Sequence, residues 1–135
     1  MIRLAAGLLV VLSALPVQAG WWGHRAKLPA CEAAEVISRI TERFAWAETN
    51  TWHRGFFIDD VRNIRQTSVK DEGPSHIDRR YCRSTAELSN GNRSELVYLI
   101  EAGQGFASIG WRVEFCLPSY DPYRVYDAWC RAIRP

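Results

Sequence analysis

The chain has 135 residues, and its 17 Lys and Arg against 15 Asp and Glu give a formal net charge of +2 at pH 7. This near-neutral balance argues against general binding to nucleic acid or to anionic membranes, both of which favour strongly basic surfaces. The length suits one domain with a core of its own and argues against a multidomain protein.

Residues 1–19 have the layout of a secretory signal peptide. Arg3 supplies a short basic segment, residues 4–15 form an apolar run of 12 residues, and Ala19 ends a small-x-small pattern that suits cleavage. A membrane-spanning helix needs about 20 apolar residues, so this run is too short to span. We therefore expect cleavage after Ala19 and a periplasmic or secreted location, with an uncleaved anchor as the alternative.

After cleavage, we expect the remaining chain to consist of a leader over residues 20–30 and a single disulfide-stapled domain over residues 31–135. The loss of Arg3 lowers the basic side chains from 17 to 16, against 15 acidic ones. The mature chain therefore stays close to neutral, and we expect no membrane span after signal cleavage.

The four cysteines are Cys31, Cys82, Cys116 and Cys130. An even number in a small exported chain predicts two disulfides and leaves no thiol to act as a nucleophile. Of the three pairings, we favour Cys116 with Cys130, which closes a short loop, and Cys31 with Cys82, which ties the start of a helix to a strand. A zinc site is the alternative, although the spacing contains no C-x-x-C pair.

Apolar residues recur at steps of three and four from Cys31 onward, which is typical of one face of a helix. Charged residues such as Glu35 and Arg39 fall on the other side. We predict one long helix from Cys31 to about Trp52, ended near Gly55.

From residue 56 the period changes to two, which is typical of strands. We predict four strands, over residues 56–69, 77–88, 95–102 and 106–116. Between the second and third, Asn90-Gly91 predicts a type I′ hairpin turn, in which both central residues have positive φ. The side chains on one face of the second strand are mostly small, which suits a closely packed helix: Cys82, Ser84, Ala86 and Leu88.

These elements predict an α+β fold, with one long N-terminal helix packed on a curved four-stranded antiparallel sheet and two disulfides. The element order matches the cystatin-like and NTF2-like layouts by architecture. In the tail, residues 117–135, Asp121-Pro122 predicts a turn. Cys130 would then hold the tail against the end of the last strand.

Several runs in the chain resemble a family of small exported proteins from alphaproteobacteria: Arg79 to Arg83, Gly105 to Trp111, Val113 to Cys116, and Tyr120 to Arg131. The similarity covers roughly Cys31 to Arg134. It implies a location in the cell envelope and carries over no catalytic or binding residues.

The motifs of common catalytic sites are incomplete. Residues 105–110 approach the G-x-S-x-G pattern of serine hydrolases, but Phe106 stands in the place of the first glycine, and the run lies within a predicted strand. His24, His53 and His76 lack the short spacing of metal ligands. We therefore predict no catalytic residues, no metal and no cofactor.

A single aspartate on a curved sheet could still act as a general base, as in isomerases of the NTF2-like layout. Asp60 with Tyr81 or Tyr98 would form such a constellation. This possibility supports an alternative function, a small pocket enzyme of the hydrolase or isomerase type, with its pocket between helix and sheet.

The most suggestive local feature is a group of basic residues around the second strand. Arg79 and Arg83 share a strand face with Tyr81 between them, and the hairpin brings Arg93 near the far end of that strand. We predict a cationic, aromatic stripe that binds an acidic partner or a small anion. In the alternative interpretation, the stripe is a solvated face neutralised by nearby carboxylates such as Glu95 and Glu101.

Aromatic residues recur every three positions in the tail: Tyr120, Tyr123, Tyr126 and Trp129. Such a series more often covers the edge of a core than forms a recognition surface, and both interpretations stay open. Taken together, the sequence predicts an exported, non-enzymatic binding or accessory module whose partner is a protein or a small anionic ligand of the cell envelope.

Overall fold

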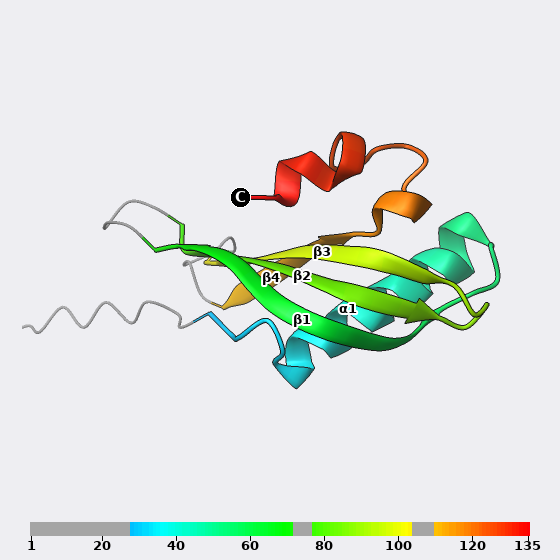
Figure 1. Ribbon diagram of the computed structural model, residues 1–135, viewed down its shortest axis with the longest axis horizontal. Coiled ribbons are helices and arrows are strands. Elements are labelled where there is room, and N and C mark those ends of the chain that lie inside the picture. The colour runs from blue at the N-terminus through cyan, green and yellow to red at the C-terminus, as the bar shows by residue number, and fades with distance from the viewer. Residues whose placement is uncertain (1–27, 72–76, 104–109) are drawn as a thin grey trace, which may run out of the picture.

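The computed structural model describes residues 28–71, 77–103 and 110–135. Within them, one helix packs on a four-stranded antiparallel sheet of strand order β1-β2-β3-β4 (Figure 1). The predicted fold class is therefore confirmed. The signal peptide, most of the leader and the first part of the predicted fourth strand lie outside the described residues, as do His24 and His76.

Helix α1 spans Ala34–Ala47 and continues as one π-helical turn over Glu48–Trp52. Its buried stripe consists of Val36, Ile40 and Phe44, at the predicted spacing of four. The helix ends at Trp52, because the next residue, His53, adopts a left-handed conformation (φ 55°, ψ 33°) and donates its backbone N–H to the Glu48 carbonyl at 2.8 Å.

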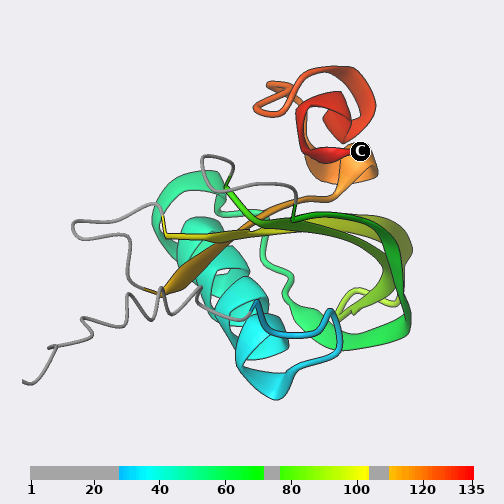
Figure 2. The ribbon, with the colours of Figure 1, turned by 90° about the vertical axis from the view of Figure 1, so that its left-hand side faces the viewer.

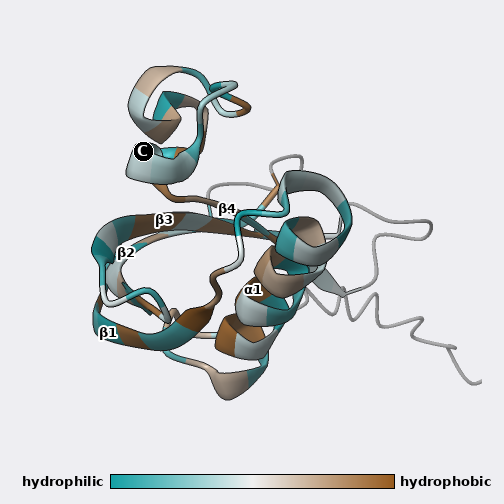
Figure 3. Ribbon diagram, turned by 90° about the vertical axis from the view of Figure 1, so that its right-hand side faces the viewer, coloured by the Kyte–Doolittle hydropathy of each residue, from teal (hydrophilic) through white to brown (hydrophobic). Residues whose placement is uncertain are grey.

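The strands are β1 (Ile58–Lys70), β2 (Arg79–Leu88), β3 (Arg93–Ala102) and β4 (Trp111–Cys116). The sheet curls from β4 to β1, and α1 lies in its concavity (Figure 3). Each strand pairs with the next along the chain, so every connection can be short.

The hairpin between β2 and β3 differs from the predicted type I′ turn. The Leu88 N–H donates to the Asn92 carbonyl at 2.9 Å, so three residues, Ser89 to Gly91, close the loop. Of these three, only Gly91 has a positive φ (+83°). A three-residue loop needs a left-handed residue only at its last position, and glycine occupies that position.

The main core fills the space between α1 and the concave face of the sheet. The predicted small-residue face of β2 is confirmed, because Cys82, Ala86 and Leu88 are buried there beneath the helix. From β3, Tyr98 is fully buried and donates its hydroxyl to the Cys31 carbonyl at 2.8 Å. This bond satisfies a polar group in the middle of the core.

A second, smaller cluster lies on the opposite, convex face of the sheet, under the C-terminal tail (Figures 1 and 2). Val97 and Leu99 from β3 meet Ile133 from the tail there, together with Tyr81 from β2. The strand pattern predicted Tyr81 on an open face, but the residue is only 6% exposed. The expectation failed because the tail returns over this face.

Both predicted disulfides are present, and no described cysteine is free. The Cys31–Cys82 bridge joins the segment that leads into α1 to the middle of β2 across 51 residues of sequence. The Cys116–Cys130 bridge joins the end of β4 to the tail across 14 residues. Each of the two covering elements, helix and tail, is thus fastened covalently to the sheet.

The β4 edge of the sheet is closed by arginines of the helix. The Gly103 N–H donates to the Gly110 carbonyl, so the Gly110 carbonyl points toward β3. Carbonyls point to alternate sides along a strand, and those of Trp111 and Val113 therefore point away from β3. Arg39 donates to the Trp111 carbonyl at 3.1 Å, and Arg43 donates to the Val113 carbonyl. Unpaired strand edges invite association with other chains, and these two bonds occupy the exposed acceptors.

The β1 edge is protected differently. Its pairing with β2 contains three register shifts, and Asn63 takes a left-handed φ of 54° within one of them. Bulges and exposed charged residues both make an edge a poor template for a further strand.

Replacing both Arg39 and Arg43 by alanine is expected to promote self-association, because it uncovers two carbonyls and the rings of Trp111 and Phe115 on which the guanidinium groups lie. Sedimentation velocity over a range of concentrations would measure it. The double lysine variant keeps a donor at each position and serves as the control. A monomeric alanine variant would show that the edge needs no such protection.

Removing the Cys31–Cys82 bridge by a double alanine substitution is expected to cost about 4 kcal/mol of the free energy of unfolding, and removing Cys116–Cys130 about 3 kcal/mol. The order follows from the lengths of chain that the bridges close, 51 and 14 residues. Urea unfolding of the two double variants and the wild type would test the order. A larger loss from the shorter loop would contradict the entropic argument.

Candidate functional site

The predicted basic stripe lies on the convex face, where the register places carboxylates beside it. Arg79 lies opposite Glu101, and its Nε is 2.8 Å from Glu101 Oε1. Arg93 lies opposite Glu87, with Arg93 Nη2 3.4 Å from Glu87 Oε1. Each of these two cations therefore has a carboxylate partner on the neighbouring strand.

Glu101 is the most buried carboxylate of this face, at 5% exposure. Burial opposes its ionisation, but hydrogen bonds from Arg79 and Arg112 outweigh this effect and hold the pKa of Glu101 below its ordinary value. Arg112 approaches from β4, with its Nη2 2.8 Å from Glu101 Oε2. The carboxylate thus links three neighbouring strands.

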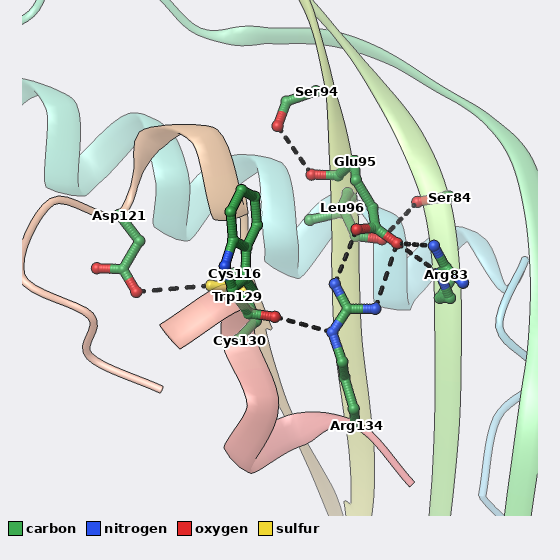
Figure 4. A network of polar contacts seen from close by, with 10 residues as sticks. All are labelled: Arg83, Ser84, Ser94, Glu95, Leu96, Cys116, Asp121, Trp129, Cys130 and Arg134. Atoms are coloured by element: carbon green, nitrogen blue, oxygen red, sulfur yellow. Dashed lines mark hydrogen bonds and ion pairs between the residues drawn. A yellow bond between two sulfur atoms is a disulfide. The ribbon is translucent and has the colours of Figure 1, made fainter. Parts of the chain in front are cut away.

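Glu95 occupies the equivalent place near the start of β3 (Figure 4). It receives Arg83 from β2 and Arg134 from the tail, whose Nη2 lies 2.8 Å from Glu95 Oε2. Burial of Glu95 raises its pKa, but the hydrogen bonds from Arg134 and Arg83 lower it more. Arg134 also donates to the Trp129 carbonyl at 2.8 Å, so the pair fixes the end of the tail on the sheet.

Arg65 is the residue of this face that the sequence analysis missed. It lies directly opposite Arg83 in the register of β1 and β2 and is exposed. Like charges directly opposite each other on a sheet repel. Among the residues that the structure describes, no carboxylate pairs with Arg65.

A groove of about 520 Å³ runs beside these two arginines. Its lining combines the arginines with one carboxylate and neutral hydrogen-bonding groups: Asn63, Arg65, Arg83, Ser84, Thr85 and Glu95. A second hollow of about 280 Å³ continues from Arg83 toward Ile133 and Arg134 of the tail. We refer to the two together as the convex groove.

The convex groove has an excess of positive charge. Among the side chains that line it, three guanidinium groups, of Arg65, Arg83 and Arg134, face one carboxylate, that of Glu95. The neighbouring Arg62 is already paired, with its Nε 2.7 Å from Asp60 Oδ2. Within the described part of the groove, Arg83 and Arg134 therefore share Glu95, and Arg65 is left without a side-chain carboxylate.

The general-base constellation is not assembled. Asp60 is exposed beside Arg62, Tyr81 is covered by the tail, and Tyr98 lies in the main core on the other face. Burial raises the pKa of Tyr98 above its ordinary value. The space between helix and sheet, where the enzyme alternative places its pocket, holds the main core.

The aromatic series of the tail divides into two pairs. Tyr120 packs on the main core and Tyr126 on the second cluster. Tyr123 and Trp129 are exposed to 77% and 75%. His53 is also exposed, and in the described ranges no three His, Cys, Asp or Glu side chains come together to hold a metal ion.

Comparisons with known proteins found no match among family models, curated proteins or solved structures. Within the described residues, no helix has the length and hydrophobicity needed to cross a membrane. The two disulfides are typical of proteins in oxidising, extracellular-type compartments.

The lowered pKa of Glu101 predicts a pH-dependent stability. Because the folded pKa lies below the ordinary 4.5, the ionised group stabilises the fold above that value, and this contribution is lost as pH falls through the folded pKa. Glu101→Gln is expected to lower the free energy of unfolding by about 1–2 kcal/mol at pH 7. Urea unfolding at pH 7 and pH 3 would show the difference from wild type shrinking, and an equal difference at both pH values would contradict the prediction.

Proposed function

We propose that the protein is an exported, non-enzymatic binding module, and that its convex groove holds a carboxylate-rich segment of another protein of the cell envelope. The observation that carries the proposal is Arg65, an exposed guanidinium that lies opposite Arg83 and has no carboxylate partner among the described residues.

Repulsion between Arg65 and Arg83 favours an anion between them, because a carboxylate would offset both charges. A guanidinium can bind a carboxylate through two parallel N–H···O bonds. Arg83 uses its Nε and Nη2 on Glu95, which leaves Nη1 for a ligand. The site therefore combines Arg65, which has no carboxylate partner among the described residues, with Arg83, which has one nitrogen left for a ligand.

The shape of the convex groove favours a chain segment over a small molecule. The groove extends from Asn63 to the tail and has neutral groups such as Thr85 and Thr67 along its course. Extended acidic segments present carboxylates at intervals, which suits a surface with cations at separate points. The disulfides and the predicted signal peptide support placing this function outside the cytoplasm.

Binding can be measured with a fluorescent, glutamate-rich peptide of about ten residues, by anisotropy at low salt. Arg65→Glu is expected to weaken binding at least tenfold, because it removes a charge-assisted hydrogen bond and adds a repulsive carboxylate. Raising the salt concentration from 0.05 to 0.5 M should weaken wild-type binding, since exposed charges are screened.

Arg124→Glu is the matched control, because Arg124 is an exposed arginine of the tail outside the groove and the change in charge is the same. Equal affinities of the wild type and the Arg65→Glu variant would refute the proposed site. Competition by acetate or citrate without any peptide binding would favour the small-anion version of the function.

A further inference from the structure

A separate pocket lies where the end of α1 meets the end of β4 and the start of the tail. Its volume is about 140 Å³, and its walls are mainly carbon, contributed by Phe44 and Ala47 of the helix, Phe115 of β4, and Leu117 and Val125 of the tail. A cavity of about 150 Å³ lined by apolar side chains is large enough to bind benzene. We refer to this space as the terminal pocket.

One wall of the terminal pocket is held by the Arg54–Glu48 pair. The Glu48 side chain is 1% exposed and receives Arg54, whose Nη1 also donates to the Tyr120 carbonyl at 2.8 Å. The Arg54 guanidinium lies 4.9 Å from the centre of the Trp52 ring and 5.8 Å from that of Tyr120. The charge of Arg54 is thus compensated, and the wall is formed before any ligand arrives.

The rim of the terminal pocket has one uncompensated charge. Asp121 Oδ1 accepts the Val125 backbone N–H at 3.2 Å, which orients the carboxylate. Its Oδ2 lies 3.6 Å from Cys116 Sγ, but a disulfide sulfur has no proton to donate. Within the described residues no cation forms an ion pair with Asp121, so the rim is negative while Arg54 and Glu48 cancel.

We propose that the terminal pocket binds a small molecule with one aromatic ring and a positively charged amine, the ring among the apolar walls and the ammonium group against Asp121. The volume admits a single ring, and the carboxylate at the rim selects the charge of the substituent. This site differs from the convex groove in sign, in lining and in ligand, and it does not depend on the proposed function.

Benzylamine, benzyl alcohol and benzoate share a ring and differ in charge, so they test the proposal directly. Each would be titrated into the isotope-labelled protein at pH 7, with binding followed by the NMR shifts of the backbone amides. Benzylamine is expected to bind about fivefold more tightly than benzyl alcohol, from the difference between charged and neutral hydrogen bonds, and benzoate most weakly.

Two variants separate the roles of space and charge. Ala47→Leu fills the pocket and should abolish binding of benzylamine, and Val125→Trp, at a 65% exposed position, closes the mouth without touching the core. Asp121→Asn keeps an oxygen for the Val125 N–H and should bind benzylamine and benzyl alcohol equally. Arg65→Glu should leave all three affinities unchanged, which separates this site from the convex groove.

The proposal is overturned if folded wild-type protein binds none of the three compounds at millimolar concentration. Unchanged benzylamine binding in both the Ala47→Leu and Val125→Trp variants would overturn it as well. Tighter binding of benzoate than of benzylamine would exclude the role assigned to Asp121.

Discussion

Strand β3 is buried on both faces, and the rest of the structure follows from the need to cover it. Its residues from Leu96 to Ile100 are all buried, alternating between the main core and the second cluster. A sheet of four strands cannot bury both faces by itself, so one element must lie on each side. Helix α1 covers the concave face and the tail covers the convex face, each fastened by a disulfide. The tail covers only part of its face, and the convex groove lies in the part left open.

Carboxylates on the convex face work as bridges between elements. Glu101 joins β2 to β4, and Glu95 joins β2 to the tail, each through two arginines. Two arginines to one carboxylate leave an excess of positive charge on this face, although the whole chain is nearly neutral. Such partly exposed pairs contribute little to stability individually. Their larger effect is on position, since they fix where the remaining guanidinium groups point.

Periodicity within short segments predicted the helix and the four strands, and the even number of cysteines in the chain predicted two disulfides. The burial of Tyr81 depends on a contact with Ile133, far along the chain, and no local pattern reveals such a contact. Arg65 was missed for a related reason. Its place opposite Arg83 depends on a register shift near Asn63. An asparagine within a strand does not by itself predict a bulge. One signal of the covered convex face was available in the sequence, the apolar run of β3. A strand that is buried on both faces is apolar at successive positions.

The two covalent fastenings make the fold conditional on the chemistry of its surroundings. Together they supply about 7 kcal/mol by loop-closure arithmetic, whereas a domain of this size has only about 5–15 kcal/mol in all. In a reducing compartment the same chain loses that contribution and stays close to the unfolded state. Oxidation of the two cysteine pairs therefore shifts the same chain strongly toward the folded state.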